Sequence, residues 1–174
     1  MSRHEASYRE YTRPTSSGVR QMSNREIVEE AIDTIKMGKR KSLSGRDTLE
    51  FFFQDGAKDQ SLCREGLTDM QNGIEMLLKG LIQYYGESYV EEHSTDNNGN
   101  ILKELVRFHQ SLDELNDIFT ILTDGDYSYM FFKCAKFPRY SVLRTDRRFR
   151  NLSYILVDKL VSYVNKYIFT DDYR

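Results

Sequence analysis

Residues 61–85 carry the clearest structural signal in the sequence, a helix with one broad apolar stripe. Apolar side chains recur there at intervals of three, four and seven residues, which is the spacing of one face of an α-helix. They are Leu67, Met70, Ile74, Leu77, Leu78, Leu81, Ile82 and Tyr85. Strand patterns are weak elsewhere, and Pro14 and Pro138 are the only prolines. The sequence therefore predicts an all-α fold.

The chain before this helix divides into three segments. Residues 1–22 are polar and aperiodic, so we interpret them as a flexible arm. Residues 23–45 are expected to form a short N-terminal helix and a basic linker, with a capping box at Ser23 and the helix end at Gly38. A second short helix is predicted over residues 46–54.

The chain after this helix alternates helices with polar turns. Turns are expected at residues 94–100 and 123–126, which are rich in Asp, Asn and Gly. Three helices are expected, over residues 101–122 (as one helix or two), 127–137 and 144–169. Residues 46–174 are therefore predicted to form one helical domain, an up-and-down bundle of four to five main helices.

The composition of the chain is that of a soluble globular protein. The chain has 174 residues, of which 39% are hydrophobic and 30% charged, as in a soluble globular domain with a real core. Its apolar runs are too short to span a membrane, and the charged N-terminus does not resemble a secretion signal. Cys63 and Cys134 lack metal-ligand spacing and are predicted to be buried thiols. We predict a cytoplasmic protein without metal or cofactor.

The net charge of −2 hides an asymmetry along the chain. Residues 1–47 carry ten basic and seven acidic side chains, residues 48–138 seven and sixteen, and residues 139–174 eight and four. An acidic middle followed by a basic end is compatible with two kinds of binding. The basic end could bind a polyanion locally, or two copies of the chain could pair, with the basic end of one on the acidic middle of the other.

The common catalytic motifs are missing from the sequence. It contains no GxxxxGK[ST], GxGxxG, GxSxG or HExxH pattern. His4, His93 and His109 are far apart in sequence, so they do not indicate a metal cluster. We interpret His93 and His109 as partly exposed, hydrogen-bonded side chains.

Two segments in fixed order point to a family. The first is QNGIEMLLKGLIQYYG at residues 71–86, and the second is CAKFPRY at residues 134–140. Over residues 46–170 the chain resembles the HEPN superfamily, small α-helical domains of bacterial defence and toxin–antitoxin modules and of some eukaryotic proteins. Family members carry a segment of the form A-x-E-K-x-L-K-A-L-L and a later A-R-Y-P. Here Met76 replaces the first lysine, and Lys136 and Phe137 replace Arg and Tyr.

The resemblance implies where a catalytic site should lie. Ribonucleolytic HEPN members are metal-independent and place an Arg, often followed by Asn, four to six residues before a His on one of the last helices. The Arg stabilises the charged phosphate and the His moves a proton, and two such pairs meet across a dimer. Here Arg150 and Asn151 match, but the histidine positions hold Ile155, Leu156 and Val157. No other arginine restores the pattern, so the resemblance implies a catalytically degenerate domain.

The basic start of the last helix is the candidate binding site. Arg147, Arg150, Asn151 and Tyr154 share one broad face of that helix, where they could hold a phosphate and stack a base. The predicted nucleotide- or RNA-binding residues are Arg144, Arg147, Arg148, Arg150, Asn151 and Tyr154. The alternative is a solvated helix start whose arginines pair with acidic residues of the middle segment.

Four further residues are expected to support this site, namely Gln71, Glu75, Lys79 and Lys136. Glu75 and Lys79 form an i, i+4 pair in the favourable order, which stabilises a helix by about 0.2–0.5 kcal/mol. Gln71 and Glu75 flank the apolar stripe, so a structural role inside the bundle is the stronger interpretation for both.

Three functions remain open. The favoured one is a homodimeric RNA- or nucleotide-binding unit, accessory to a nuclease or nucleotidyltransferase. The second is a metal-independent ribonuclease using Arg150 and Tyr154, although a tyrosine with a pKa near 10 is a poor base at neutral pH. The third is a protein-interaction module whose arginines meet an acidic partner. None of the three involves a membrane.

Overall fold

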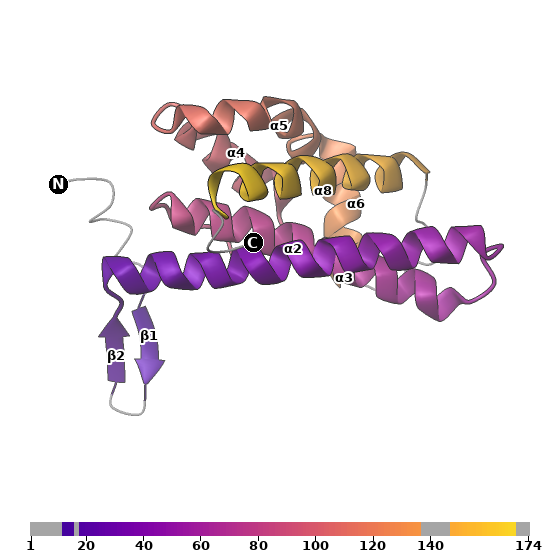
Figure 1. Ribbon diagram of the computed structural model, residues 1–174, viewed down its shortest axis with the longest axis horizontal. Coiled ribbons are helices and arrows are strands. Elements are labelled where there is room, and N and C mark those ends of the chain that lie inside the picture. The colour runs from indigo at the N-terminus through magenta and orange to yellow at the C-terminus, as the bar shows by residue number, and fades with distance from the viewer. Residues whose placement is uncertain (1–11, 16–17, 137–146, 170–174) are drawn as a thin grey trace.

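The computed structural model describes residues 12–15, 18–136 and 147–169. Two short strands, β1 (Thr12–Thr15) and β2 (Gly18–Gln21), pair antiparallel ahead of the helices. The helices are α2 (Asn24–Gln54), α3 (Gln60–Tyr84), α4 (Thr95–Leu105), α5 (Asn116–Leu122), α6 (Gly125–Lys136) and α8 (Arg147–Tyr167). A 3-10 helix, η1 (Gln110–Leu115), precedes α5. The predicted all-α helical bundle is confirmed (Figure 1).

The two long helices α2 and α3 form an antiparallel hairpin whose backbones are in direct contact. Small residues recur every seven positions on both helices, at Gly38 and Gly45 on α2 and at Gly66, Gly73 and Gly80 on α3. A Cβ atom built on Gly45 would lie 2.2 Å from the backbone nitrogen of Met70. Such a distance is far inside van der Waals contact, so glycine is required for this approach.

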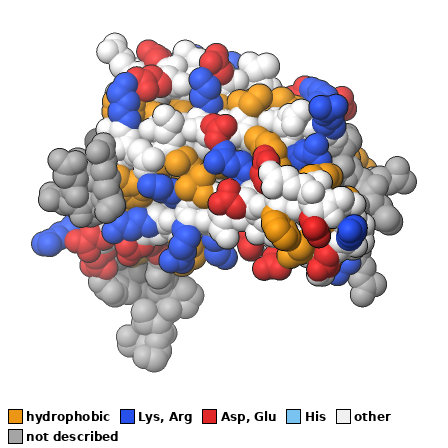
Figure 2. Space-filling view, turned by 45° about the vertical axis from the view of Figure 1, so that its right-hand side comes forward, with side chains coloured by type: hydrophobic (Ala, Val, Ile, Leu, Met, Phe, Trp, Pro, Cys, Tyr) orange, Lys and Arg blue, Asp and Glu red, His pale blue; other side chains and the backbone are white. Residues whose placement is uncertain are grey.

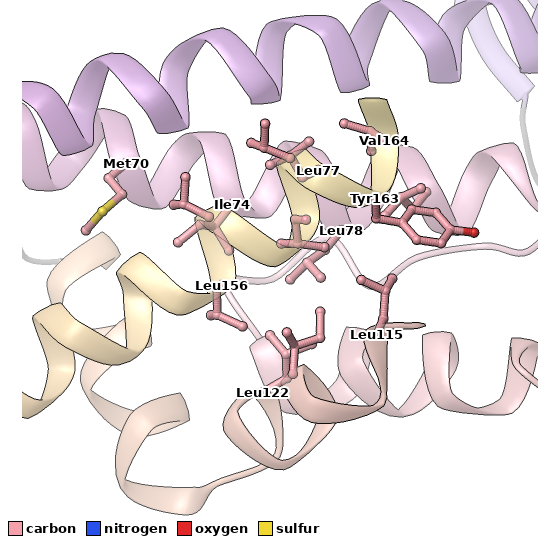
Figure 3. Packing of buried hydrophobic residues seen from close by; sticks show 14 of the residues in the cluster. Met70, Ile74, Leu77, Leu78, Leu115, Leu122, Leu156, Tyr163 and Val164 are labelled. Atoms are coloured by element: carbon pink, nitrogen blue, oxygen red, sulfur yellow. The ribbon is translucent and has the colours of Figure 1, made fainter. Parts of the chain in front are cut away.

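The other helices pack on the remaining side of α3. In Figure 1, α8 runs along the hairpin, α4 and α5 lie above it, and α6 crosses steeply. Apolar side chains from α3, η1, α5 and α8 meet in one core (Figure 3). The labelled members are Met70, Ile74, Leu77, Leu78, Leu115, Leu122, Leu156, Tyr163 and Val164. The apolar stripe predicted for residues 61–85 is thus the centre of the fold.

Polar contacts fasten α8 to α2 along one edge. Lys39 Nζ donates a hydrogen bond to Asn165 Oδ1 at 2.6 Å, and Arg46 forms an ion pair with Asp158. Seven residues further along α2, the ring of Phe53 contacts Arg150. The contacts at positions 39, 46 and 53 run antiparallel to those at 165, 158 and 150. They therefore fix the register of α8 on α2.

A second set of ion pairs fastens the opposite edge of α8 to the acidic middle of the chain. Lys166 pairs with Glu114 at 2.7 Å, Lys159 with Asp117 at 3.7 Å and Arg148 with Asp124 at 3.4 Å. Part of the charge asymmetry in the sequence is thus used within one molecule. Basic and acidic side chains are intermixed over the face shown in Figure 2.

Several boundaries predicted from the sequence are wrong. Residues 39–45 are not a linker and residues 46–54 are not a separate helix, because residues 24–54 form the single helix α2. Gly38 therefore does not end a helix. Its role is close packing, since a Cβ atom there would lie 2.8 Å from the backbone nitrogen of Leu77. Residues 94–100 are not a turn but the start of α4, with Ser94 as the N-cap. The buried Asn98 faces inward and binds the backbone of Val90 through both its amide oxygen and its amide nitrogen.

Other boundaries agree with the sequence. The helix predicted over residues 61–85 is α3, and residues 101–122 divide into two helices at a 3-10 turn. The sequence predicts a flexible arm over residues 1–22, whereas Thr12–Thr15 and Gly18–Gln21 pair as two antiparallel strands. No helix in the described part of the chain is long and apolar enough to cross a bilayer.

Candidate functional site

The candidate site lies at the first turns of α8, which begins at Arg147 in the described chain. Arg147, Arg148 and Asn151 are exposed, whereas Arg150 is half-buried. Arg144 lies outside the described residues. The structure therefore places three of the predicted binding side chains in solvent and leaves two, Arg150 and Tyr154, half-buried.

Arg150 rests on an aromatic ring at the end of α2. Its guanidinium carbon lies 3.8 Å from the ring centroid of Phe53, which is van der Waals distance for a cation–π contact. The Phe53 ring meets the buried ring of Phe52 edge-on, with centroids 4.9 Å apart. Phe52 anchors this end of α2 in the core, so it also fixes where Phe53 and Arg150 meet.

Tyr154 lies one turn beyond Arg150 and is also half-buried. Burial, with a smaller contribution from the nearby Glu50 carboxylate, raises the pKa of Tyr154 to about 12. A phenol with this pKa is protonated at neutral pH and does not act as a general base there. Burial also raises the pKa of the neighbouring Cys63 thiol, so that side chain is an unreactive core residue.

We expect this pKa shift to appear in the pH dependence of stability. An unfolded tyrosine ionises near pH 10, whereas Tyr154 in the folded protein ionises near 12. Its contribution to stability is therefore complete below pH 10 and is lost as the pH rises towards 12. Denaturant unfolding at pH 9 and 11 should show a smaller loss for Tyr154→Phe than for the wild type. Equal losses in the two proteins would contradict this assignment.

Arg148 faces the opposite side of α8, toward the start of α6. Its guanidinium lies 3.4 Å from an Asp124 oxygen. The other oxygen of Asp124 accepts a hydrogen bond from the Tyr127 backbone, and this bond is the main cause of the lowered pKa of that carboxyl. Arg148 also lines a hollow of about 340 Å³ together with Asp126, Tyr127, Tyr129, Met130 and Phe149. Arg148 therefore both forms an ion pair with Asp124 and lines an open hollow.

The four supporting residues do not join the arginines. Gln71 is buried and donates to the Phe131 carbonyl at 2.9 Å, as its predicted structural role requires. Lys136 is exposed at the end of α6, with its Nζ atom 5.3 Å from the ring centroid of Phe132. The side chains of Glu75 and Lys79 bind the segment that follows α3, away from α8.

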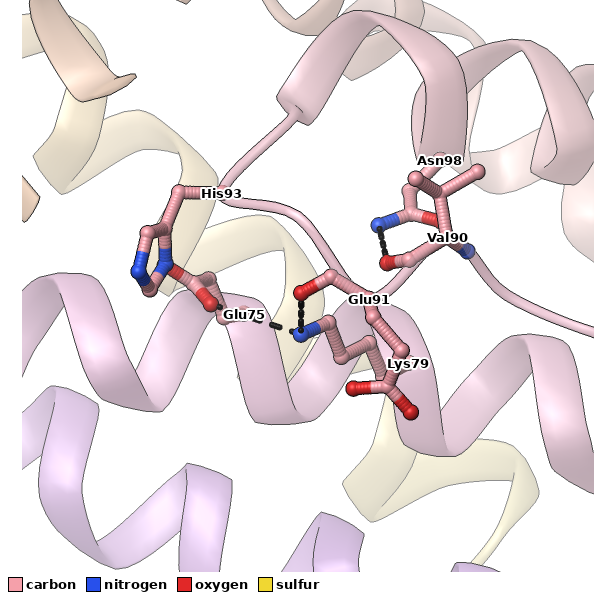
Figure 4. A network of polar contacts seen from close by, with 6 residues as sticks. All are labelled: Glu75, Lys79, Val90, Glu91, His93 and Asn98. Carbon is pink, nitrogen blue, oxygen red and sulfur yellow. Dashed lines mark hydrogen bonds and ion pairs between the residues drawn. The ribbon is translucent and has the colours of Figure 1, made fainter. Parts of the chain in front are cut away.

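Glu75 and Lys79 anchor the segment between α3 and α4 (Figure 4). Glu75 binds His93 Nδ1 at 2.6 Å and Lys79 Nζ at 3.6 Å, while Lys79 donates to the Glu91 carbonyl at 3.0 Å. The side chains of Glu75 and Lys79 are 12% and 16% exposed, so the pair is largely buried. His93 is 42% exposed and hydrogen-bonded, which confirms its interpretation from the sequence. Together these bonds hold the loop against α3.

Phe53 contacts Arg150 at this site, and the pattern of arginines in the sequence does not predict it. The run Phe51, Phe52 and Phe53 carried the signal that could have found it. Successive residues of a helix point about 100° apart, so one core stripe cannot take all three rings. Here only Phe52 is buried, at 4% exposure, while Phe51 is 56% and Phe53 38% exposed.

Comparisons with models of protein families, with curated proteins and with solved structures gave no match. The resemblance to the HEPN superfamily therefore stays a prediction. Among the described residues no group of three or more His, Cys, Asp or Glu side chains could hold a metal ion.

Proposed function

We propose that this chain is a non-catalytic binding module for RNA or nucleotides, of the HEPN-like type and acting as a homodimer. The observation that carries the proposal is the group of basic side chains at the start of α8. Arg147 and Arg148 are exposed there beside the exposed amide of Asn151. Guanidinium and amide groups at this spacing are suited to phosphate oxygens.

Positive charge at a helix N-terminus opposes the helix dipole and needs compensation. Asp124 compensates Arg148, and the Phe53 ring contacts Arg150. No described residue forms an ion pair or side-chain hydrogen bond with Arg147 or Asn151. A phosphate bound at this point would offset the positive charge of Arg147, which supports an anionic ligand.

The ribonuclease alternative is less well supported. The pKa of Tyr154 is raised to about 12, so its hydroxyl is not a base at neutral pH. His93 is bound to Glu75 on the far edge of α3 and has no described contact with the arginines of α8. We therefore propose binding without cleavage, as an accessory to a nuclease, a nucleotidyltransferase or another partner.

Binding to single-stranded RNA tests the proposal. We expect anisotropy of a labelled RNA of about 12 nucleotides, in EDTA, to show binding that weakens as salt rises. The double variant Arg147→Ala/Asn151→Ala should bind about tenfold more weakly and show a salt slope lower by about 0.7, the value for one lost single-strand phosphate contact. Gel analysis of the same mixtures should show intact RNA.

Arg107→Ala is the matched control, because Arg107 is a 73% exposed arginine beyond the end of α4. Its affinity should equal that of the wild type. Equal weakening by both variants would point to non-specific charge attraction. Absence of binding at low salt would contradict the proposal and favour a protein-interaction module. Cleavage in EDTA would contradict the non-catalytic assignment.

A further inference from the structure

Two phenylalanines near the end of α2 stay partly exposed in the part of the chain that the structure describes. Phe51 is 56% exposed and Phe53 is 38% exposed, although aromatic rings gain most from burial. They lie two positions apart on a helix and therefore point about 200° apart. Phe51 lines a shallow groove with Arg40 and Leu62, while Phe53 meets Arg150 at the start of α8. Of the two rings, Phe53 is thus the one that lies beside the arginines at the start of α8.

Phe53 and Arg150 bring an aromatic ring and a cation together at the start of α8. The guanidinium carbon lies 3.8 Å from the ring centroid, so the cation lies over the ring. Phe52 holds the ring from within the core, and half-burial of Arg150 limits its movement. Aromatic rings and guanidinium planes are the two side-chain surfaces on which unpaired nucleobases stack.

We propose that the Phe53–Arg150 pair stacks one unpaired base of a single-stranded nucleic acid whose phosphates contact Arg147 and Asn151. This inference rests on the proposed function and adds the form of the ligand. Bases in a duplex are already stacked on one another, so a platform of this kind selects single strands. Every base has an aromatic face, so the selection is tolerant of sequence.

The absence of tryptophan from the chain gives a direct test. A Phe53→Trp variant carries a single indole at the platform, and a stacked base quenches its fluorescence. A Phe51→Trp variant places the same reporter two residues away on another face of α2. Both are titrated with a single-stranded adenosine tetranucleotide and, separately, with inorganic polyphosphate. Thermal melts of both variants check that they are folded.

We expect the oligonucleotide to quench Phe53→Trp strongly and Phe51→Trp little, and polyphosphate to quench neither. Phe53→Leu should weaken oligonucleotide binding about tenfold while leaving polyphosphate binding unchanged. Binding measured by anisotropy without quenching at Phe53→Trp would overturn the stacking platform and leave the proposed function standing. Quenching of both variants alike would also overturn it. No binding of either probe at low salt would overturn the proposed function, and the platform with it.

Discussion

Replacing Gly73 by alanine is expected to lower the free energy of unfolding by about 3 kcal/mol, the upper end of the usual range for an overpacked core. In most helix interiors this change stabilises a protein by about 0.5–1 kcal/mol, because alanine is the better helix former. Here the new Cβ atom would lie 2.2 Å from the Ser42 nitrogen and 2.6 Å from its Cα. Backbone atoms cannot avoid the clash by changing rotamer, so α2 and α3 must move apart. The core between them and the other helices then loses packing contacts.

Thermal unfolding followed by circular dichroism measures the effect. For a domain of this size, 3 kcal/mol corresponds to a fall in Tm of about 10 °C. Gly125→Ala is the matched control, because Gly125 also lies in a helix but no described atom outside its own stretch of backbone lies within 4 Å of the position that a Cβ would take there. Its Tm should stay the same or rise slightly. A Tm for Gly73→Ala equal to that of the control would show that the two helix backbones are not in direct contact.

Removing either hydroxyl of the Tyr127–Ser153 pair is expected to cost about 2 kcal/mol, because an unsatisfied buried polar group costs about 1–3 kcal/mol. Tyr127 on α6 and Ser153 on α8 are both buried, and their oxygen atoms are 2.9 Å apart. Ser153→Ala leaves the phenol without this partner inside the core, and Tyr127→Phe does the same to the serine. Each loss exceeds the net contribution of an ordinary hydrogen bond.

A double-mutant cycle distinguishes this pair from two independent substitutions. The variant Tyr127→Phe/Ser153→Ala removes both polar groups, so we expect it to lose less stability than the sum of the two single variants. Urea unfolding gives all four free energies. Ser162→Ala, at an exposed position of α8, is the control and should change stability by less than about 0.5 kcal/mol. Additive losses in the cycle would mean that the two hydroxyls do not interact.

The sequence predicts the helices of this protein better than their ends. The apolar stripe of residues 61–85 predicts α3 correctly, because helical periodicity over the whole segment is incompatible with a strand or a loop. Gly38 was misinterpreted because glycine serves two purposes, ending helices and letting them approach closely. A seven-residue repeat of glycine on both helices indicates close approach and not a helix end. The repeat consists of Gly38 and Gly45 on α2 and of Gly66, Gly73 and Gly80 on α3.

The sequence predicts only part of how the candidate residues are placed. Periodicity placed Arg147, Arg150 and Asn151 on one face of α8, and the structure keeps Arg147 and Asn151 in solvent. Periodicity does not indicate which of these arginines contact side chains of other helices. The contacts of Arg148 with Asp124 and of Arg150 with Phe53 join residues 24 and 97 positions apart, and local spacing carries no information about such pairs.

The glycine contact between α2 and α3 also affects how the molecule can move. Most helix pairs are spaced by side chains, which reach other rotamers and let the helices shift. Here peptide groups touch peptide groups, and these have no alternative rotamers. The two helices are therefore expected to move as one rigid body. The single strand that we propose at the start of α8 would meet Phe53 at a fixed position, with little ordering of the hairpin left to oppose binding.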